Sequence, residues 1–375
     1  MYKRWFIALG SISVLALMTA WEFRTNSADL QQAIGKSPQT NTPVVIEVNG
    51  NPPAALPATV SGRLPTVTAA AIERTAVSLF DIALGDTEQQ VLSKWGQPQR
   101  RDPSPFGYVW LVYNQDLDRY LQVGIADGKV VDLYSNAPAA AVDDIGVGTD
   151  YQTLAQKHEL KNTVSFTYKE VNVELTNQVK ERPLVLVGGT PIIFYLDKHS
   201  QSDVSAIRLV DKLILLRGGY YEMKWTYSGD GPNFDAPVLT LLQRQQIDTA
   251  HARQIFDLVN VSRRRNQLPP LAWNEQVASV AQSHSHDMSD AHFFDHISAS
   301  TGLDPFERLK FSHIAYQAAG ENIAAGYPDA IEAHEGWMNS PGHRKNILSK
   351  EFSQLGAGVY DDFYTEDFIT PRAPQ

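Results

Sequence analysis

Histidine, a side chain that can bind metals or move protons, is concentrated in the last third of this 375-residue chain. Eight of the ten histidines lie between Thr240 and Gln375. Two imidazoles and one or two carboxylates in a cleft can bind zinc with an open coordination position. The same groups can form a general acid/base pair or a hydrogen-bonding pocket. The composition of this region therefore leaves three kinds of polar site open.

Three short motifs place histidines, carboxylates and aromatic residues at defined positions in this region. They are Phe293-Phe294-Asp295-His296, Gly320-Glu321-Asn322-Ile323-Ala324 and Trp337-Met338-Asn339-Ser340-Pro341-Gly342-His343-Arg344. His292 and His296 are four residues apart, which would suit a metal pair on a helix. The two intervening phenylalanines and the following Ser298 indicate that the helix is ending. We therefore do not expect His292 to be a ligand.

The remaining histidines of the region have structural interpretations. His284 lies on the apolar face of its predicted helix, so we expect it to be packed and hydrogen-bonded. The histidines expected at the surface are His251, His286, His313 and His334.

Ser340 has two possible roles. Serine at the N-cap followed by Pro341 in the first turn is a sound helix start. Ser340 near His343 could also be read as a nucleophile with its base, but the chain has no G-x-S-x-G nucleophile elbow. We interpret the serine as a helix cap.

Two helices should begin the C-terminal region. Leu241 to Arg265 has the periodicity of an amphipathic helix, and Asn274 can cap a second one. Arg263-Arg264-Arg265 is the one dense basic patch, and we expect it to be a solvated helix end. The formal net charge of −10 argues against nucleic acid as a main partner, because phosphate contacts need clustered Lys and Arg.

Residues 79–217 show an α+β pattern with an internal near-repeat. Ile82-Ala83-Leu84-Gly85-Asp86-Thr87 and Ile145-Gly146-Val147-Gly148-Thr149-Asp150 each look like a turn into a capped helix. Each helix precedes strand signals, and Asp127-Gly128 is a good hairpin turn. Strands are predicted at 108–113, 120–125, 129–134, 164–168, 171–175, 184–187, 192–196 and 204–210. We predict two related helix-plus-hairpin units that share sheets and carry no catalytic cluster.

The first 78 residues contain a topology signal and a spacer. Lys3 and Arg4 precede an uncharged run from Trp5 to Trp21, which as a helix would span about 25 Å, near the lower limit for a bilayer. The leading positive charges place the N-terminus in the cytoplasm and the rest outside. We interpret residues 1–24 as an uncleaved anchor in preference to a cleaved signal peptide, because the cleavage signal is poor. Residues 25–78, rich in Pro, Ala and Thr, read as a flexible linker.

The chain contains no cysteine. Disulfide frameworks, thiol catalysis and zinc–thiolate sites are therefore excluded. A secreted protein without cysteine fits an organism that does not rely on disulfides outside the cell.

The motifs, taken in order and spacing, resemble a known family. FFDH, GEN and WMNSPGHR resemble the bacterial branch of the CAP superfamily, which includes cysteine-rich secretory proteins, antigen 5 and pathogenesis-related proteins. The resemblance covers residues 240–375 and implies an α/β/α sandwich with a large cleft. Trp95-Gly96-Gln97-Pro98 and Tyr108-Val109-Trp110 resemble the CAP-associated N-terminal domain of Bacillus-type proteins, which implies a separate domain at 79–217. Residues 218–239 connect the two, and the aromatic residues expected to pack across the interface are Tyr220, Tyr221, Trp225 and Tyr227.

The resemblance also implies a cleft lined by two histidines and two glutamates that can bind a divalent ion. His296 matches the first histidine and Glu321 the first glutamate. Ser340 stands where the second glutamate is usual, and the second histidine is missing from 362–366, so His343 offers a replacement. Glu332 or Glu335 could supply the missing carboxylate. The predicted metal-binding or catalytic residues are therefore His296, Glu321 and His343, and the predicted ligand pocket adds Asn322, Glu335 and Trp337.

Two functions remain open from the sequence. An extracytoplasmic, stalk-mounted CAP domain would bind a lipid, a peptide or a cell-wall fragment in its cleft, with or without a divalent metal such as zinc. Alternatively, zinc or Glu321 would activate water in a hydrolase of cell-envelope material or protein. The missing members of the four-residue set favour binding, because catalysis tolerates lost ligands less well.

The anchor makes a testable prediction. Deleting Trp5 to Trp21 should release the protein from membranes, because the uncharged run is the segment expected to cross the bilayer. Fractionation of the native host measures this. A soluble native protein with a new N-terminus near Trp21 or Asp29 would instead indicate cleavage.

Overall fold

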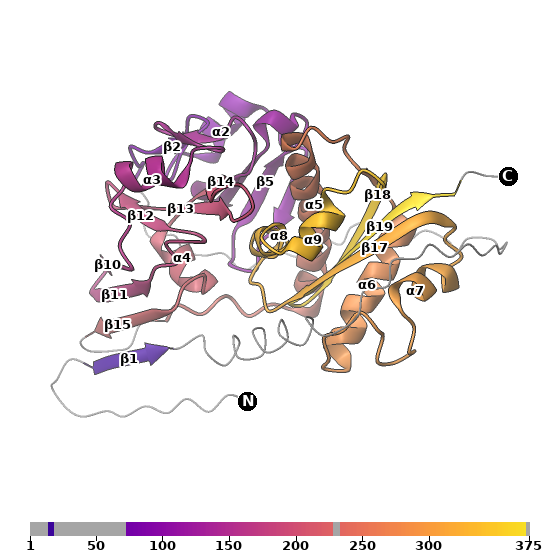
Figure 1. Ribbon diagram of the computed structural model, residues 1–375. Coiled ribbons are helices and arrows are strands. Elements are labelled where there is room, and N and C mark those ends of the chain that lie inside the picture. Colours follow the sequence, from indigo (N-terminus) through magenta and orange to yellow (C-terminus); the bar gives the residue numbers. More distant parts are fainter. Residues whose placement is uncertain (1–13, 19–72, 228–232, 373–375) are drawn as a thin grey trace.

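A seven-stranded antiparallel sheet organises the first half of the computed structural model, which describes residues 14–18, 73–227 and 233–372 (Figure 1). The strand order is β12-β13-β14-β7-β6-β5-β4. The strands are β4 (Arg100–Pro103), β5 (Val109–Tyr113), β6 (Leu121–Ala126), β7 (Lys129–Ser135), β12 (Leu184–Val187), β13 (Thr190–Asp197) and β14 (Asp203–Val210). Both halves of the region contribute strands, so the predicted sharing of a sheet is observed. We call residues 73–227 the N-terminal unit.

Two short hairpins each lead into a capped helix in this unit. They are β2 (Ser78–Leu79) and β3 (Ile82–Ala83) before α2 (Glu88–Trp95), and β8 (Ala141–Val142) and β9 (Ile145–Gly146) before α3 (Tyr151–Lys157). Thr87 and Asp150 cap the two helices through their side chains, as predicted. Asp127 and Gly128, both at positive φ, form the predicted turn between β6 and β7. A repeat of whole units stays a prediction.

A second, smaller sheet has the order β1-β15-β11-β10. Its members are β1 (Val14–Met18), β10 (Thr163–Tyr168), β11 (Val171–Thr176) and β15 (Met223–Tyr227); α4 (Lys212–Gly218) and the 3-10 helix η1 (Leu117–Arg119) complete the unit. Val14–Met18 is thus a strand where the sequence predicted part of a spanning helix. The rest of that predicted span and residues 25–72 of the linker lie outside the described residues. Among the helices that the structure does describe, none combines the length and apolarity needed to cross a bilayer.

The C-terminal unit, residues 233–372, is an α/β/α sandwich. Its sheet has the order β16-β18-β19-β17, built from β16 (Ala272–Trp273), β17 (Tyr316–Ala325), β18 (Gln354–Tyr360) and β19 (Phe363–Pro371). Its helices are α5 (Leu241–Arg265), α6 (Glu275–Asp290), α7 (Pro305–Phe311), α8 (Ala330–Met338) and α9 (Pro341–Ile347). Helices α6 and α7 cover one face, and α5, α8 and α9 cover the other (Figure 1). This is the layered fold that the family resemblance implied.

Two glycines explain how closely α6 approaches the sheet. A Cβ added at Gly356 or Gly358 of β18 would lie about 2 Å from the α6 backbone at Ala278 or Gln282. Only glycine permits this approach. The Gly-Ala-Gly stretch of the sequence is therefore a packing requirement of the sandwich.

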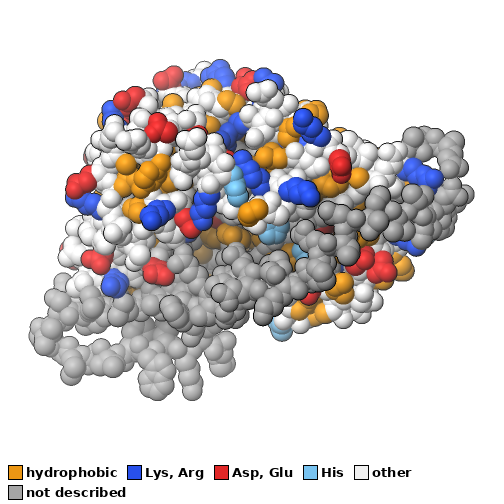
Figure 2. Space-filling model, viewed as in Figure 1, with side chains coloured by type: hydrophobic (Ala, Val, Ile, Leu, Met, Phe, Trp, Pro, Cys, Tyr) orange, Lys and Arg blue, Asp and Glu red, His pale blue; other side chains and the backbone are white. Residues whose placement is uncertain are grey.

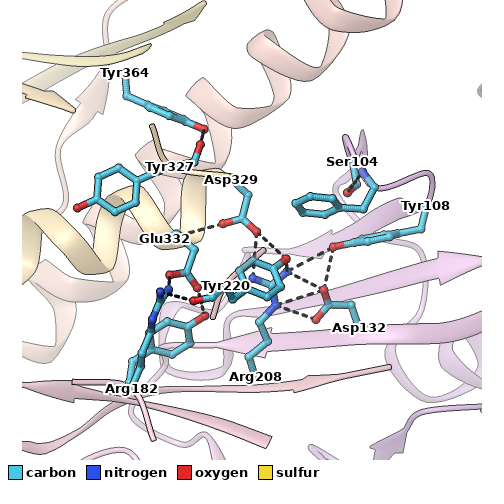
Figure 3. A network of polar contacts seen from close by, with 12 residues as sticks. Ser104, Tyr108, Asp132, Arg182, Arg208, Tyr220, Tyr327, Asp329, Glu332 and Tyr364 are labelled. Carbon is cyan, nitrogen blue, oxygen red and sulfur yellow. Dashed lines mark hydrogen bonds and ion pairs between the residues drawn. The ribbon is translucent and has the colours of Figure 1, made fainter. Parts of the chain in front are cut away.

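The two units meet through a buried ion cluster centred on Arg208 of β14 (Figure 3). Its guanidinium donates to both oxygens of Asp132 at 2.7–3.2 Å and to Asp329 of the C-terminal unit at 3.0 Å. Arg208 also donates to the Tyr220 hydroxyl at 2.7 Å. Arg208 and Asp132 are fully buried, and Asp329 is nearly so. The cluster therefore holds strand β14 against the start of α8, which Asp329 caps.

The units have separate sheets but share hydrophobic packing. Leu258 and Val261 of α5 and Ile331 of α8 belong to the same buried cluster as the core of the N-terminal unit. Tyr220 contacts both units as predicted, because its hydroxyl accepts from Arg208 and donates to Asp329 of the C-terminal unit. The division into separate domains at 79–217 and 240–375 stays a prediction.

The expectation that Arg263-Arg264-Arg265 is a solvated helix end is wrong for two of the three residues. Arg263 is fully buried and donates to the carbonyls of Pro269, Ile347 and Ser349. Arg265 donates to the Ser205 carbonyl of the N-terminal unit. The reason is tertiary, since both units pack around the end of α5, and only Arg264 is largely exposed.

The Arg208 cluster makes a prediction about stability. Arg208→Met should destabilise the protein by about 3–5 kcal/mol, because it leaves buried Asp132 and Asp329 without a counter-charge. Urea unfolding measures the change.

Arg264→Met is the matched control. Arg264 also joins the two units, through Asp118, but this pair is exposed and screened by solvent, so its loss should matter little. Equal effects of the two substitutions would contradict the assigned role of Arg208.

Candidate functional site

His296 and Glu321 form a hydrogen-bonded pair at the edge of the C-terminal sheet. Glu321 lies near the middle of β17, and His296 lies in the loop that follows α6. The Nδ1 of His296 is 2.7 Å from Oε1 of Glu321, so a proton on Nδ1 points to the carboxylate and leaves Nε2 with its lone pair. Glu321 is buried, whereas 39% of the His296 side chain is exposed. The structure therefore brings these two residues of the predicted site into contact.

Arg308 of α7 is the third member of this group, and the sequence analysis missed it. Its guanidinium pairs with Oε2 of Glu321 and donates to the carbonyls of His296 and Leu303 at 2.7 and 3.1 Å. Arg308 is buried and thus clamps both the carboxylate and the loop that carries His296. The available signal was the Asp304-Pro305 helix start, which places Arg308 one turn into α7.

His343 approaches the pair from the opposite layer, on α9. Burial, and secondarily the interaction with His296, lowers the pKa of His343 to about 4. The imidazole is therefore neutral near pH 7, and its ring nitrogens can accept or donate. His343 is therefore close enough to interact with His296. Within the described residues, no hydrogen bond joins Glu321 and His343.

Asn322 positions His343 and does not line the pocket. Its side-chain amide donates to the His343 carbonyl at 3.2 Å and to Glu366 at 2.8 Å. Its oxygen accepts from Asn346 of α9 at 2.9 Å. Asn322 is fully buried, so the prediction of a ligand-contacting role does not fit its place in the core.

The two glutamates of α8 that could have completed the set bind the N-terminal unit instead. Glu332 accepts from Tyr195 at 2.5 Å and pairs with Arg182. Glu335 accepts from Tyr134 at 2.8 Å and from Ser205 at 3.0 Å. Their side of α8 faces the other unit, so neither joins His296 and Glu321.

Two other predictions about this region need correction or refinement. His251 and His334 were expected at the surface but are buried, at 3% and 0% exposure, because α5 and α8 are covered on several sides. Burial lowers the pKa of His251 to about 4 and of His334 to about 3. Ser340 starts α9 as predicted, but its side chain makes no capping hydrogen bond. His284 is buried and bonded to the Asp295 carbonyl, as expected.

Two buried carboxyl groups, Glu366 and Asp367, lie on β19, the strand that pairs with the strand carrying Glu321. Asp367 is the cross-strand partner of Glu321, and burial, reinforced by that carboxylate, raises the pKa of Asp367 well above its usual range. Burial raises the pKa of Glu366, on the opposite face, to about 8. Adjacent acids within an otherwise apolar strand were a sequence signal for such burial. At neutral pH both groups are therefore held protonated, and Glu321 is next to one uncharged acid.

The residues do not fit a three-ligand metal centre as they are arranged. Both oxygens of Glu321 are engaged, one by His296 and one by the Arg308 cation. No group of three or more His, Asp or Glu with metal-holding geometry occurs among the described residues. Within the predicted set of three, only the two imidazoles have ring nitrogens that no described hydrogen bond occupies, Nε2 of His296 and both nitrogens of His343. Metal binding at His296, Glu321 and His343 stays a prediction.

A cleft of about 650 Å³ opens beside His343, between the two units. Its N-terminal wall includes Glu181, Arg182 and Lys198, and its C-terminal wall includes Phe294, residues 323–328, Glu332, Glu335, Trp337 and His343. Figure 2 shows a hollow near the centre of this face, bordered by basic and histidine side chains. Of the predicted pocket, Glu335, Trp337 and His343 line the cleft, whereas His296, Glu321 and Asn322 are not among its lining residues.

The neutral state of His343 makes a prediction about pH dependence. Its folded pKa, about 4, lies below the value near 6.5 expected when unfolded, so the unfolded chain binds more protons between these values. This residue's contribution to stability is therefore present above pH 6.5 and lost as the pH falls toward 4. Between pH 6.5 and pH 4, the free energy of unfolding of His343→Gln should fall by about 2 kcal/mol less than that of the wild-type protein. Urea unfolding at both pH values measures this difference. An unchanged pH dependence would show that His343 is solvated.

Comparisons with known proteins agree with this fold. The CAP-associated N-terminal family model matches residues 84–221, and the cysteine-rich secretory protein family model matches residues 256–370. The Bacillus subtilis protein YlbC, named as an uncharacterized membrane protein, is 34% identical over 289 residues, which cover 76% of this chain and 82% of YlbC. YkwD of the same organism is 39% identical over 123 residues, covering 32% of this chain and 48% of YkwD.

Solved structures give the same result. A crystal structure described as an extracellular protein containing an SCP domain from Bacillus anthracis has a TM-score of 0.70 and 39% identity, over 76% of this chain and 92% of that one. A cysteine-rich secretory protein from Staphylococcus aureus, with a TM-score of 0.64 and 20% identity over 76% of this chain and 90% of that one, shares the fold. Since one relative is matched at 34% identity over most of its length and both units match their own family models, the chain belongs to the bacterial branch of the CAP superfamily and carries a CAP-associated N-terminal domain.

Proposed function

We propose that this protein is an extracytoplasmic, membrane-anchored CAP-domain protein whose interdomain cleft binds a small ligand of the cell envelope: a lipid, a peptide or a cell-wall fragment. The observation that carries the proposal is the cleft itself, which lies between the two units and is lined by His343. Its volume, about 650 Å³, is within the usual range of small-molecule sites.

The lining of the cleft supports binding of an amphipathic molecule. The C-terminal wall contributes apolar groups from Phe294, Tyr327 and residues 323–325, while the facing wall contributes the charged Glu181, Arg182 and Lys198. Such a combination of an apolar surface with a few polar groups is typical of ligand pockets. Neutral His343 adds a hydrogen-bonding group at one end.

The location outside the cytoplasm rests on the sequence and on relatives. The uncharged run from Trp5 to Trp21 follows Lys3 and Arg4. YlbC is named as a membrane protein, and the similar Bacillus anthracis protein is described as extracellular. Zinc binding by His296, Glu321 and His343 is a separate prediction, which the binding proposal does not need.

One observation favours a hydrolase as the second candidate. His296 has the arrangement of an oriented general base, since Glu321 holds its Nδ1 and leaves Nε2 free. The sequence suggested Glu321 as the base, but both of its oxygens are occupied. In this alternative, His296 would move the proton and Glu321 would fix its tautomer.

Two substitutions separate the candidates. If the cleft binds ligand, His343→Ala should weaken binding by about tenfold, the loss expected for one hydrogen bond. NMR titration with soluble peptidoglycan fragments, short peptides and phospholipid vesicles measures this. If the protein is a hydrolase of one of these materials, His296→Asn should lower turnover by about 10²–10⁴-fold.

The matched control is His292→Asn. His292 is exposed, lies four residues from His296 and has a positive φ that asparagine tolerates. It should change neither readout. Absence of binding by all three materials would contradict the binding proposal, and equal turnover of the two asparagine variants would contradict the catalytic role of His296.

A further inference from the structure

The C-terminal wall of the cleft contains the edge of a β-sheet. Strand β17 is the outermost strand of its sheet and pairs with β19 on one side only. Its last residues, 323–325, line the cleft. An edge strand presents backbone N–H and C=O groups that can pair with another extended chain.

Hydrogen bonds at the edge show which residues direct these groups outward. In an antiparallel pair, alternate residues bond to the neighbour and the others point away. The carbonyl of Glu321 accepts from Asn346 at 3.1 Å, and that of Ile323 accepts from the Trp337 indole at 3.0 Å. Both partners lie outside the sheet, so the odd-numbered residues of this stretch point their backbone groups away from β19.

Ala325 is the next residue in this outward series. The following residue, Gly326, donates to the Asp362 carbonyl of the β18–β19 turn at 3.0 Å, which confirms that even-numbered residues face the sheet. Within the described residues, no hydrogen bond to the N–H or C=O of Ala325 is found. Ala325 therefore offers one donor and one acceptor on the cleft side of the edge.

We propose that the cleft binds a short peptide in extended conformation, which pairs its backbone with Ala325 and thereby extends the C-terminal sheet by one strand. This inference rests on the proposed binding function of the same cleft and specifies the ligand class. The backbone pair would provide affinity, and the cleft walls would select the side chains. The Ile323 carbonyl already accepts a hydrogen bond from the Trp337 indole. The peptide therefore pairs with only a few residues of β17.

The charges of the facing wall agree with a peptide. Glu181 and Lys198 form an ion pair at 2.6 Å on the N-terminal side, and Arg182 pairs with Glu332 across the cleft. Charges of both signs on one wall suit a peptide with mixed side chains. They do not favour an acyl chain, which needs continuous apolar surroundings.

The three tyrosines of the N-terminal wall, Tyr195, Tyr220 and Tyr221, offer no ring face to a glycan. Sugar recognition by stacking needs exposed ring faces, but Tyr195, Tyr220 and Tyr221 are buried at 2–3% exposure. Their hydroxyls are already bonded to Glu332, to Arg208 and Asp329, and to the Arg182 carbonyl. These rings build the N-terminal wall of the cleft, which faces the β17 edge at Ala325.

The test uses a positional-scanning library of N-acetylated, C-amidated hexapeptides and the full chain. Ala325→Pro removes the outward N–H, and proline is tolerated on an edge strand when its nitrogen faces away from the neighbour. We expect Ala325→Pro to weaken binding of the selected hexapeptide at least tenfold by fluorescence polarisation. Methylating one backbone nitrogen of that peptide should cause a similar loss, which tests the pairing even if the variant does not fold.

Two controls isolate the backbone effect. Ala325→Ser keeps the N–H at nearly the same size and should bind normally. Ala319→Pro makes the same change at an outward position of β17 away from the cleft and should also bind normally. No binding of hexapeptides at about 1 mM, or equal binding by both proline variants, would overturn the peptide inference. Binding of peptidoglycan fragments or vesicles in place of peptides would overturn it while leaving the proposed function of the cleft intact.

Discussion

The buried contact between Arg208 and Asp329 is the interaction on which the site arrangement depends. Arg208 belongs to the N-terminal sheet, and Asp329 caps the helix that carries Glu332, Glu335 and Trp337. Burying a guanidinium is costly unless carboxylates surround it, and Asp132 together with Asp329 meets this requirement. The cluster therefore sets the position of α8 relative to the N-terminal sheet. Because α8 forms one side of the cleft, the cleft is a property of both units together.

The electrostatics of the C-terminal sheet keep most of its ionisable groups neutral. Burial holds protons on Glu366 and Asp367 and keeps them off His343. Glu321 lies among these groups with Arg308 as its counter-ion. This arrangement confines charge to one carboxylate–guanidinium pair and orients the partly exposed His296 toward the solvent side of the site.

The departures from the family pattern have a structural explanation. Glu332 and Glu335 do not replace the missing family carboxylate, because both bind side chains of the N-terminal unit. His343 does come close to His296, but from α9 and with a neutral ring. The polar centre is thus smaller than the four-residue set of the family, whereas the cleft is lined by residues of both domains. A reduced polar centre next to a cleft lined by two domains supports ligand binding over hydrolysis as the proposed function.

The sequence alone determined the elements that depend on local chemistry. The helix at Leu241–Arg265, the caps at Thr87, Asp150 and Asn274 and the Asp127-Gly128 turn follow from periodicity and side-chain hydrogen bonds between near neighbours. The ordered motifs around His296, Glu321 and His343 were sufficient to identify the family and to predict that His296 meets Glu321. These signals are local or depend on order along the chain, so they need no knowledge of packing.

Tertiary structure decided which polar groups are buried and what they bind. Arg263, His251 and His334 belong to helices whose second face is covered by another layer, which helical periodicity does not reveal. Arg308 reaches Glu321 only because α7 packs beside β17, and the glutamates of α8 meet their partners only across the domain interface. The cleft likewise arises from residues separated by more than a hundred positions. Such contacts depend on the geometry of two packed units, and a pattern of residue types along one chain does not contain that geometry.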